Sequence, residues 1–141
     1  MIDPINFRND ILAILGNKLG NYTFPDGGTT TAIATLPDPD LGYQYPPHGT
    51  KTSGLEVVIK RPYPEAEGNL GGDRTLSYTW EVHLKQWDTQ DSLIEAIGLL
   101  SGDLPGDYSI ERVSFMPPSE KLLTVEQCKI FIQEWAVAVP V

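Results

Sequence analysis

The feature that most constrains the fold is a long alternation of apolar and polar residues at positions 75–87. Side chains of a β-strand point alternately to its two faces, so this spacing predicts a strand with one buried face and one solvent-facing face. The buried face would carry Leu76, Tyr78, Trp80, Val82 and Leu84. The solvent-facing side would carry Thr75, Ser77, Thr79, Glu81, His83 and Lys85.

The segment LEVVIKR at 55–61 is predicted to be the neighbouring strand, with Leu55, Val57 and Ile59 on one face. A broken run rich in Pro and Gly at 62–73 separates it from the long strand. Two strands that follow one another across such a loop most simply form an antiparallel pair. We therefore expect 62–73 to be a long tip that projects from the body.

Two helices are predicted, one before the first strands and one between the long strand and the last two strands. Asp3 and Pro4 are a helix-start signal, and Gly20 can end the helix in a left-handed conformation, which predicts a helix over about 4–19. Asp88 or Thr89 can cap a second helix that ends near Gly102. Its apolar stripe consists of Leu93, Ala96, Ile97 and Leu100.

The remaining segments predict further strands and one long loop. A turn at 25–28 separates 22–24 from the β-branched run 29–36, which indicates a short strand or hairpin. Strands are also expected at 108–115 and 125–139, and both faces of the last one carry apolar residues. The run at 37–54 holds four prolines and three glycines and is expected to be an exposed loop.

These elements predict one α+β domain over residues 1–141, in which a mostly antiparallel sheet of about five strands packs against two helices. A chain of this length usually forms one domain with one core. No repeat and no internal boundary divides it. The long hairpin loop would project from this body.

The charge balance limits the classes of partner. The chain has 19 acidic and 10 basic side chains, a formal net charge of −9, which argues against a reader of nucleic-acid sequence. No apolar run is long enough for a membrane span, and the first residues lack the basic region of a signal peptide. We therefore expect a protein made in the cytoplasm. The one cysteine, Cys128, excludes an internal disulfide.

No cluster of residues predicts catalysis, a metal or a cofactor, so we expect no enzyme activity. Cys128 is expected to be a buried structural thiol, and His83 a plain surface residue. Asp38 and Asp40 are turn-forming acids, because the spacing of a calcium loop is missing. Glu65 and Glu67 are expected to be solvated acids of the tip.

Contact with a partner is the function that the long loops favour, since loops of this length are usually functional or disordered. Tyrosine beside proline suits protein interfaces, although such rings can equally fold back over the chain's own core. Both interpretations of Tyr43, Tyr45 and Tyr63 stay open. The candidate partner interface consists of Asp38, Asp40, Tyr43, Tyr45, Tyr63, Glu65 and Glu67.

Three segments carry a resemblance to a known family. The opening IDPINFRNDILAILGNKL, the strand YTWEVHLKQWD and the final IFIQEWAVAV resemble tail terminator (tail completion) proteins of long-tailed bacteriophages. The resemblance covers size, order of elements and sequence style, without a diagnostic motif. It implies a structural virion protein that forms a ring, a hexamer in the family, which caps the tail tube and joins it to the neck or head connector. DNA would pass through the lumen, and surplus negative charge would keep it from the wall.

Other functions remain as alternatives. The chain could be another neck, head-completion or baseplate subunit. From a different class, it could be a small hydrolase whose site joins His83, Glu81 and a loop acid, or a ligand-binding module that uses the exposed tyrosines.

Overall fold

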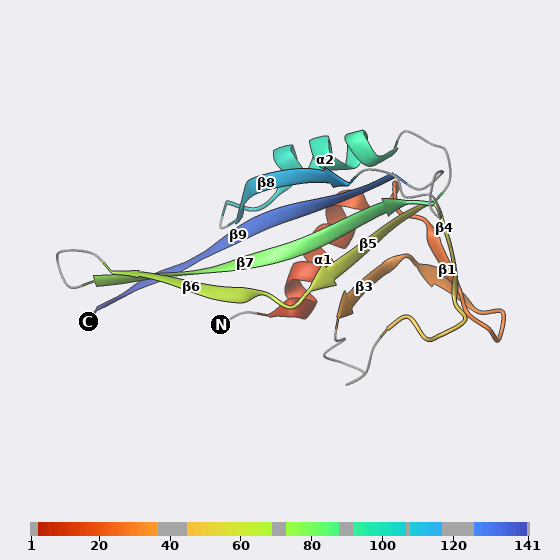
Figure 1. Cartoon of the computed structure of the whole chain (residues 1–141), viewed down its shortest axis with the longest axis horizontal. Helices are drawn as coiled ribbons and strands as arrows, with labels where there is room; N and C mark the ends of the chain where they lie inside the picture. Colours follow the sequence, from red (N-terminus) through yellow and green to blue (C-terminus); the bar gives the residue numbers. More distant parts are fainter. Residues whose placement is uncertain are drawn as a thin grey trace.

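The computed structural model describes residues 3–36, 45–68, 73–87, 92–106, 108–116 and 126–140. Two helices and two sheets form an α+β fold, as the sequence predicts (Figure 1). Neither helix in the described part of the chain is long and apolar enough to cross a bilayer.

The larger sheet has six strands in the order β3-β5-β7-β9-β8, and β6 pairs with β7 beside this path. Only β3 and β5 run parallel, so the sheet is mostly antiparallel. Its strands are β3 (Ile33–Leu36), β5 (Leu55–Lys60), β6 (Tyr63–Gly68), β7 (Asp73–Gln86), β8 (Tyr108–Met116) and β9 (Glu126–Pro140).

Both helices contribute to one apolar core with the larger sheet. These are α1 (Pro4–Leu15) and α2 (Ser92–Asp103). The Trp80 ring of β7 stacks on the Phe7 ring of α1 with 4.1 Å between centroids. The predicted apolar faces of three strands meet in this core. The buried residues that they contribute are Leu55, Val57, Ile59, Trp80, Val82, Leu84, Cys128, Ile130 and Ile132.

The first helix ends earlier than the sequence predicted. Asp3 caps it as expected, accepting hydrogen bonds from the backbone N–H groups of Ile5 and Asn6 at 3.0 and 3.3 Å. The helix stops at Leu15, because residues 16–18 form a turn and Leu19 bridges to Leu55 of β5. Gly20 is therefore no left-handed helix end: a Cβ there would lie 1.8 Å from the Ser53 carbonyl oxygen, so glycine permits a close backbone approach.

A smaller sheet corrects the prediction of one exposed loop at 37–54. It consists of β1 (Asn21–Thr23), β2 (Thr29–Thr31) and β4 (Lys51–Ser53), all antiparallel, in the order β2-β1-β4. The hairpin expected around residues 25–28 is present as β1 and β2. The last residues of the expected loop form the strand β4. This strand pairs with the edge of β1 that β2 does not occupy. Residues 37–44 lie outside the described part.

An arm extends from the body of the molecule, and it corrects the prediction for 62–73. We use the name arm for a ribbon of three strands. It consists of β6, the part of β7 from Asp73 to Thr79, and the part of β9 from Gln133 to Pro140. Tyr63–Gly68 is a strand paired with β7, so only residues 69–72, which are not described, separate the two strands of the tip. Figure 1 shows this ribbon reaching past the helices.

Candidate functional site: a cleft at the base of the arm

The outer face of the larger sheet, opposite the helices, is less exposed than the alternation predicted. Ser77 is 5% exposed and Thr79 is 6% exposed, whereas both were expected to face water. Each lies on the central strand β7 with a strand on either side: Ser77 is paired with Glu65 of β6 and Trp135 of β9. Neighbouring strands therefore bury small polar side chains even where no helix covers them.

His83 also corrects an expectation, because its side chain is only 12% exposed and is no plain surface residue. Its Nε2 lies 3.4 Å from a Glu81 carboxylate oxygen. Lys60 and Lys129 each place their Nζ 3.9 Å from the same carboxylate. Burial lowers the pKa of His83; Glu81 counteracts this, while the two lysines add to it. Burial therefore favours the neutral form of the histidine.

This arrangement provides two of the three groups of the hydrolase alternative. His83 and Glu81 are in contact, but the Glu81 carboxylate is shared with two lysines, and no group of three His, Cys, Asp or Glu able to hold a metal exists among the described residues. Cys128 is buried in the core, as expected, and burial raises its pKa to about 11. It is a thiol, and not a thiolate, at neutral pH.

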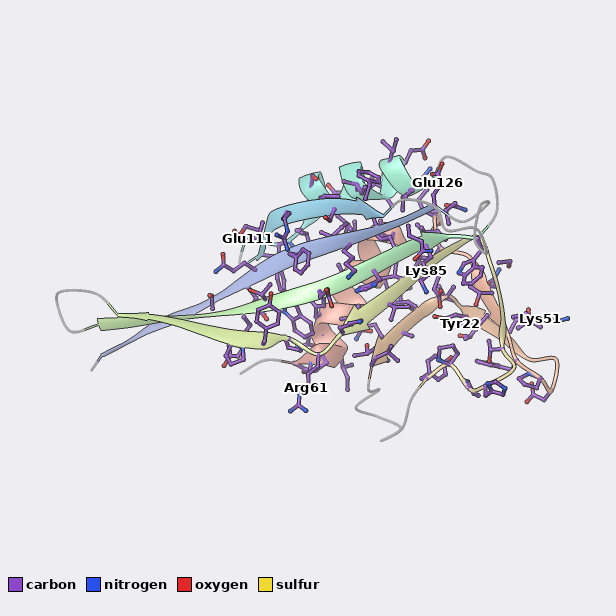
Figure 2. All side chains as sticks on the ribbon, viewed as in Figure 1. Tyr22, Lys51, Arg61, Lys85, Glu111 and Glu126 are labelled. Atoms are coloured by element: carbon purple, nitrogen blue, oxygen red, sulfur yellow. The ribbon has the colours of Figure 1, made fainter. Side chains whose placement is uncertain are left out.

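A shallow cleft of about 310 Å³ lies on the outer face where the arm joins the body. Four strands contribute to it: β6, β7, β8 and β9. Its lining residues are Tyr63, Thr79, Glu111, Arg112, Phe131 and Gln133. Figure 2 shows the labelled Glu111 on β8 near the point where the arm leaves the body.

An irregularity in β8 explains how two neighbouring charged residues reach the same cleft. Ile110 is paired with Ile132 of β9 and Arg112 with Phe131, so Glu111 is an extra residue in the β8 strand. Such a β-bulge breaks the alternation of side chains and re-aims them. Ile110 stays with the core, while both Glu111 and Arg112 line the cleft on the other face.

The guanidinium of Arg112 contacts an aromatic ring and has no carboxylate partner among the described side chains. It lies over the Phe131 ring, 4.4 Å from the centroid, which is a cation–π contact. None of the ion pairs among the described side chains includes Arg112. The adjacent Glu111 is 3.4 Å from the Ser109 hydroxyl, which donates to it. Arg112 is exposed, so a carboxylate from outside can approach its N–H groups.

The other polar groups of the cleft complete a binding surface. Gln133 donates from Nε2 to the Ser77 hydroxyl at 2.8 Å, which orients its amide. Tyr63 is 45% exposed and forms the wall on the arm side. An ordered cation, an aromatic wall and an amide can recognise a carboxylate next to an apolar group, as interfaces rich in Arg and Tyr do.

The candidate interface residues fall into three groups. Tyr63 lines the cleft, and Glu65 and Glu67 lie in β6 of the arm. Tyr45 instead packs against the Tyr22 and Phe24 rings, each 6.0 Å away between centroids, so it covers the chain's own second core. Asp38, Asp40 and Tyr43 lie outside the described residues.

Sequence reasoning missed Arg112 and Phe131. Phe131 gave a signal, since it stands between the buried Ile130 and Ile132 on a strand that is apolar on both faces. Arg112 gave none, because its position depends on the bulge, and the bulge is defined only by the register with β9.

A buried polar cluster joins the two sheets away from the cleft. The Tyr22 hydroxyl of β1 donates to one Glu56 carboxylate oxygen at 2.6 Å, and Trp87 Nε1 donates to the other at 2.9 Å. Glu56 is buried, and burial together with the Glu56 charge raises the pKa of Tyr22 far above its usual range. We interpret this cluster as structural, because both carboxylate oxygens already have donors.

Comparison of the chain with protein-family models, with curated proteins and with solved structures found no match.

Proposed function

We propose that the chain is a structural subunit that assembles with copies of itself into a ring. The observation that carries the proposal is the arm, which leaves strand edges open beyond the body. Among the arm side chains that the structure describes, none belongs to the helix-packed core, and contacts with other molecules best explain such a ribbon.

The two outer edges of the arm differ, and the difference supports a pairing role for one of them. β8 accompanies β9 only as far as Glu134, which is paired with Tyr108, whereas β9 continues to Pro140 paired with β7. The sequence of this stretch, WAVAV, has no charge. The β6 edge carries Pro64, Glu65 and Glu67, and proline and charge are the features that protect edges from pairing. Between Trp135 and Val139 the β9 edge carries neither proline nor charge, and Pro140 stands only at its end.

The resemblance to tail terminator proteins suggests a position for this ring in a phage virion. In the proposal, the subunits form a ring, which we expect to be a hexamer. The ring caps the phage tail tube in the virion and joins it to the neck or connector. DNA passes through its lumen. Another neck, head-completion or baseplate subunit would use the same arm. Labelling the subunit in intact virions and locating the label by electron microscopy distinguishes these positions.

The assembly is tested by native mass spectrometry and negative-stain microscopy of the chain alone and with tail tubes from the parent phage. We expect rings, or a ring at one end of the tube. A monomer at all concentrations that binds neither tubes nor neck proteins would overturn the proposal. Assembly that requires the tube would agree with it, because a partner that binds only the assembled form shifts the equilibrium.

The unprotected β9 edge is tested by Val137→Lys, which adds the charge that natural edge strands use against pairing. Ala66→Lys, on the protected β6 edge, is the matched control. We expect Val137→Lys to reduce ring formation much more than Ala66→Lys does. Equal effects would argue against strand pairing at the β9 edge.

The contact between His83 and Glu81 keeps the hydrolase alternative testable. That alternative requires a peptide- or cell-wall-cleaving activity that His83→Ala abolishes. We expect no such activity in the unaltered chain, and turnover lost on this one substitution would overturn the structural proposal.

A further inference from the structure

We infer that the cleft at the base of the arm receives the acidic arm of a neighbouring copy. This inference rests on the proposed function, because it requires that copies assemble, and it names the side chains that hold them together.

The cations of the outer face differ in whether they already have a carboxylate partner. On the outer face, Lys60 and Lys129 already share the Glu81 carboxylate. Arg112 is ordered over Phe131 and has no carboxylate within ion-pair distance among the described side chains. Copies of a chain with a net charge of −9 repel one another, so a contact between them is most favourable where the surface offers a cation that is outside an ion pair.

The arm is acidic along β6 and at the start of β7. These two segments contain the carboxylates Glu65, Glu67 and Asp73 against one cation, Arg74. Both segments belong to the arm, which reaches past the helices (Figure 1). Arginine and carboxylate are complementary in charge and in geometry, since the guanidinium can donate two parallel hydrogen bonds. The arm therefore offers carboxylates to the Arg112 guanidinium of the cleft.

The carboxylates of a molecule's own arm cannot fill its own cleft. Glu65 is in register with Ser77 and Trp135, whereas Arg112 is in register with Phe131. The two residues are thus three strands apart across the sheet, about 14 Å, and four residues apart along it, about 13 Å. This separation exceeds the combined reach of the two side chains, so Glu65 can reach Arg112 only from another copy.

The contact joins two different surfaces, the end of one arm and the base of the next. A contact of this heterologous kind generates a ring when the rotation between copies closes, and a filament when it does not. The inference thereby agrees with the ring of the proposed function. Glu111 lies in the same cleft and would repel an incoming carboxylate, so removing its charge should strengthen the contact.

A charge exchange tests the inference. We expect Arg112→Glu and the double variant Glu65→Lys/Glu67→Lys each to weaken association about tenfold or more at low salt, corresponding to loss of one strong interfacial ion pair. Combining all three substitutions should restore association to within about threefold of the unaltered chain. Lys51→Glu, which alters an exposed lysine of the smaller sheet, is the matched control and should have little effect beyond net charge. Glu111→Gln should strengthen association.

Sedimentation velocity of the full chain over a range of concentrations measures these effects, and thermal unfolding checks that every variant folds. Arg112→Gln keeps a polar side chain and serves if Arg112→Glu does not fold. If the unaltered chain assembles and the Arg112 variants assemble as well as Lys51→Glu does, the inference fails while the proposed function stands. Failure of the exchanged pair to recover also contradicts it. If the unaltered chain never assembles, both are overturned.

Discussion

The two faces of the larger sheet differ in how they are kept from water. The helix-covered face is apolar, and its centre is the stack of Phe7 on Trp80. The outer face buries polar groups through hydrogen bonds and ion pairs, such as those of Glu56 and Glu81, and leaves the cleft open. One alternating strand therefore contributes both to an apolar core and to a polar surface that can bind a partner. The first face should therefore govern stability, and the second should respond to pH and salt.

Replacing Trp80 by Ala should have the largest effect on stability. Trp80 is fully buried, stacks on Phe7, and donates from Nε1 to Glu134 at 3.1 Å. Removing a buried aromatic side chain of this size lowers the free energy of unfolding by about 3–5 kcal/mol. Urea unfolding measures the change. Phe131→Ala, on the opposite face and only partly buried, is the control; an equal loss there would mean that the two faces do not differ.

Replacing Tyr22 by Phe tests the polar link between the sheets. It removes the hydroxyl that donates to Glu56 and leaves the buried carboxylate with Trp87 as its remaining donor from this cluster. A hydrogen bond to a charged group contributes about 1.5–3 kcal/mol, so unfolding should become easier by that amount. Tyr63→Phe removes an exposed hydroxyl and should change stability by less than about 0.5 kcal/mol. Similar values for both variants would contradict the structural role of the cluster.

His83 should make stability depend on pH. Its folded pKa lies below the ordinary value because of burial, so the unfolded chain binds a proton first as the solution is acidified. The contribution to stability is present above about pH 6.5, the ordinary histidine value, and is lost as the pH falls below it. Thermal unfolding between pH 7.5 and 5.5 should show a smaller decrease for His83→Gln than for the unaltered chain. His48→Gln, at an exposed position, should retain the full decrease.

Replacing Glu81 by Gln should have the smallest effect. Its contacts with Lys60 and Lys129 are long, 3.9 Å each, and the two lysines are partly exposed. Pairs of this kind contribute less than about 1 kcal/mol and are screened by salt. Chemical unfolding at low and high salt should show a small loss that disappears at high salt. A loss above 2 kcal/mol would place Glu81 among the residues that define the fold.

The parts of the fold that short-range patterns define were predicted correctly. The strand around Trp80, the cap at Asp3 and the class of the fold follow from spacing and capping, which act within a few residues. The strands β4 and β6 were missed because proline and glycine surround them, and their hydrogen bonds go to strands that are distant in sequence or across a turn. The end of α1 was misplaced because Leu19 pairs with Leu55, far along the chain.

The candidate site was predicted in part. Tyr63, Glu65 and Glu67 were chosen for their composition, and the structure places Tyr63 in the cleft. Tyr45 has the same sequence surroundings as Tyr63 and lies over the chain's own second core. Proline and tyrosine in one segment therefore do not decide whether a ring faces inward or outward, since that depends on which element lies above it.

The sequence by itself determined the alternation of the long strand, the helix start at Asp3 and the acidic balance, because each is a property of neighbouring residues or of composition. The tertiary structure alone decided that His83 is largely buried, that Glu111 and Arg112 share a cleft, and that β9 extends past β8. These features arise from the register between strands far apart in the chain. A shift of one residue in that register would move every side chain to the other face.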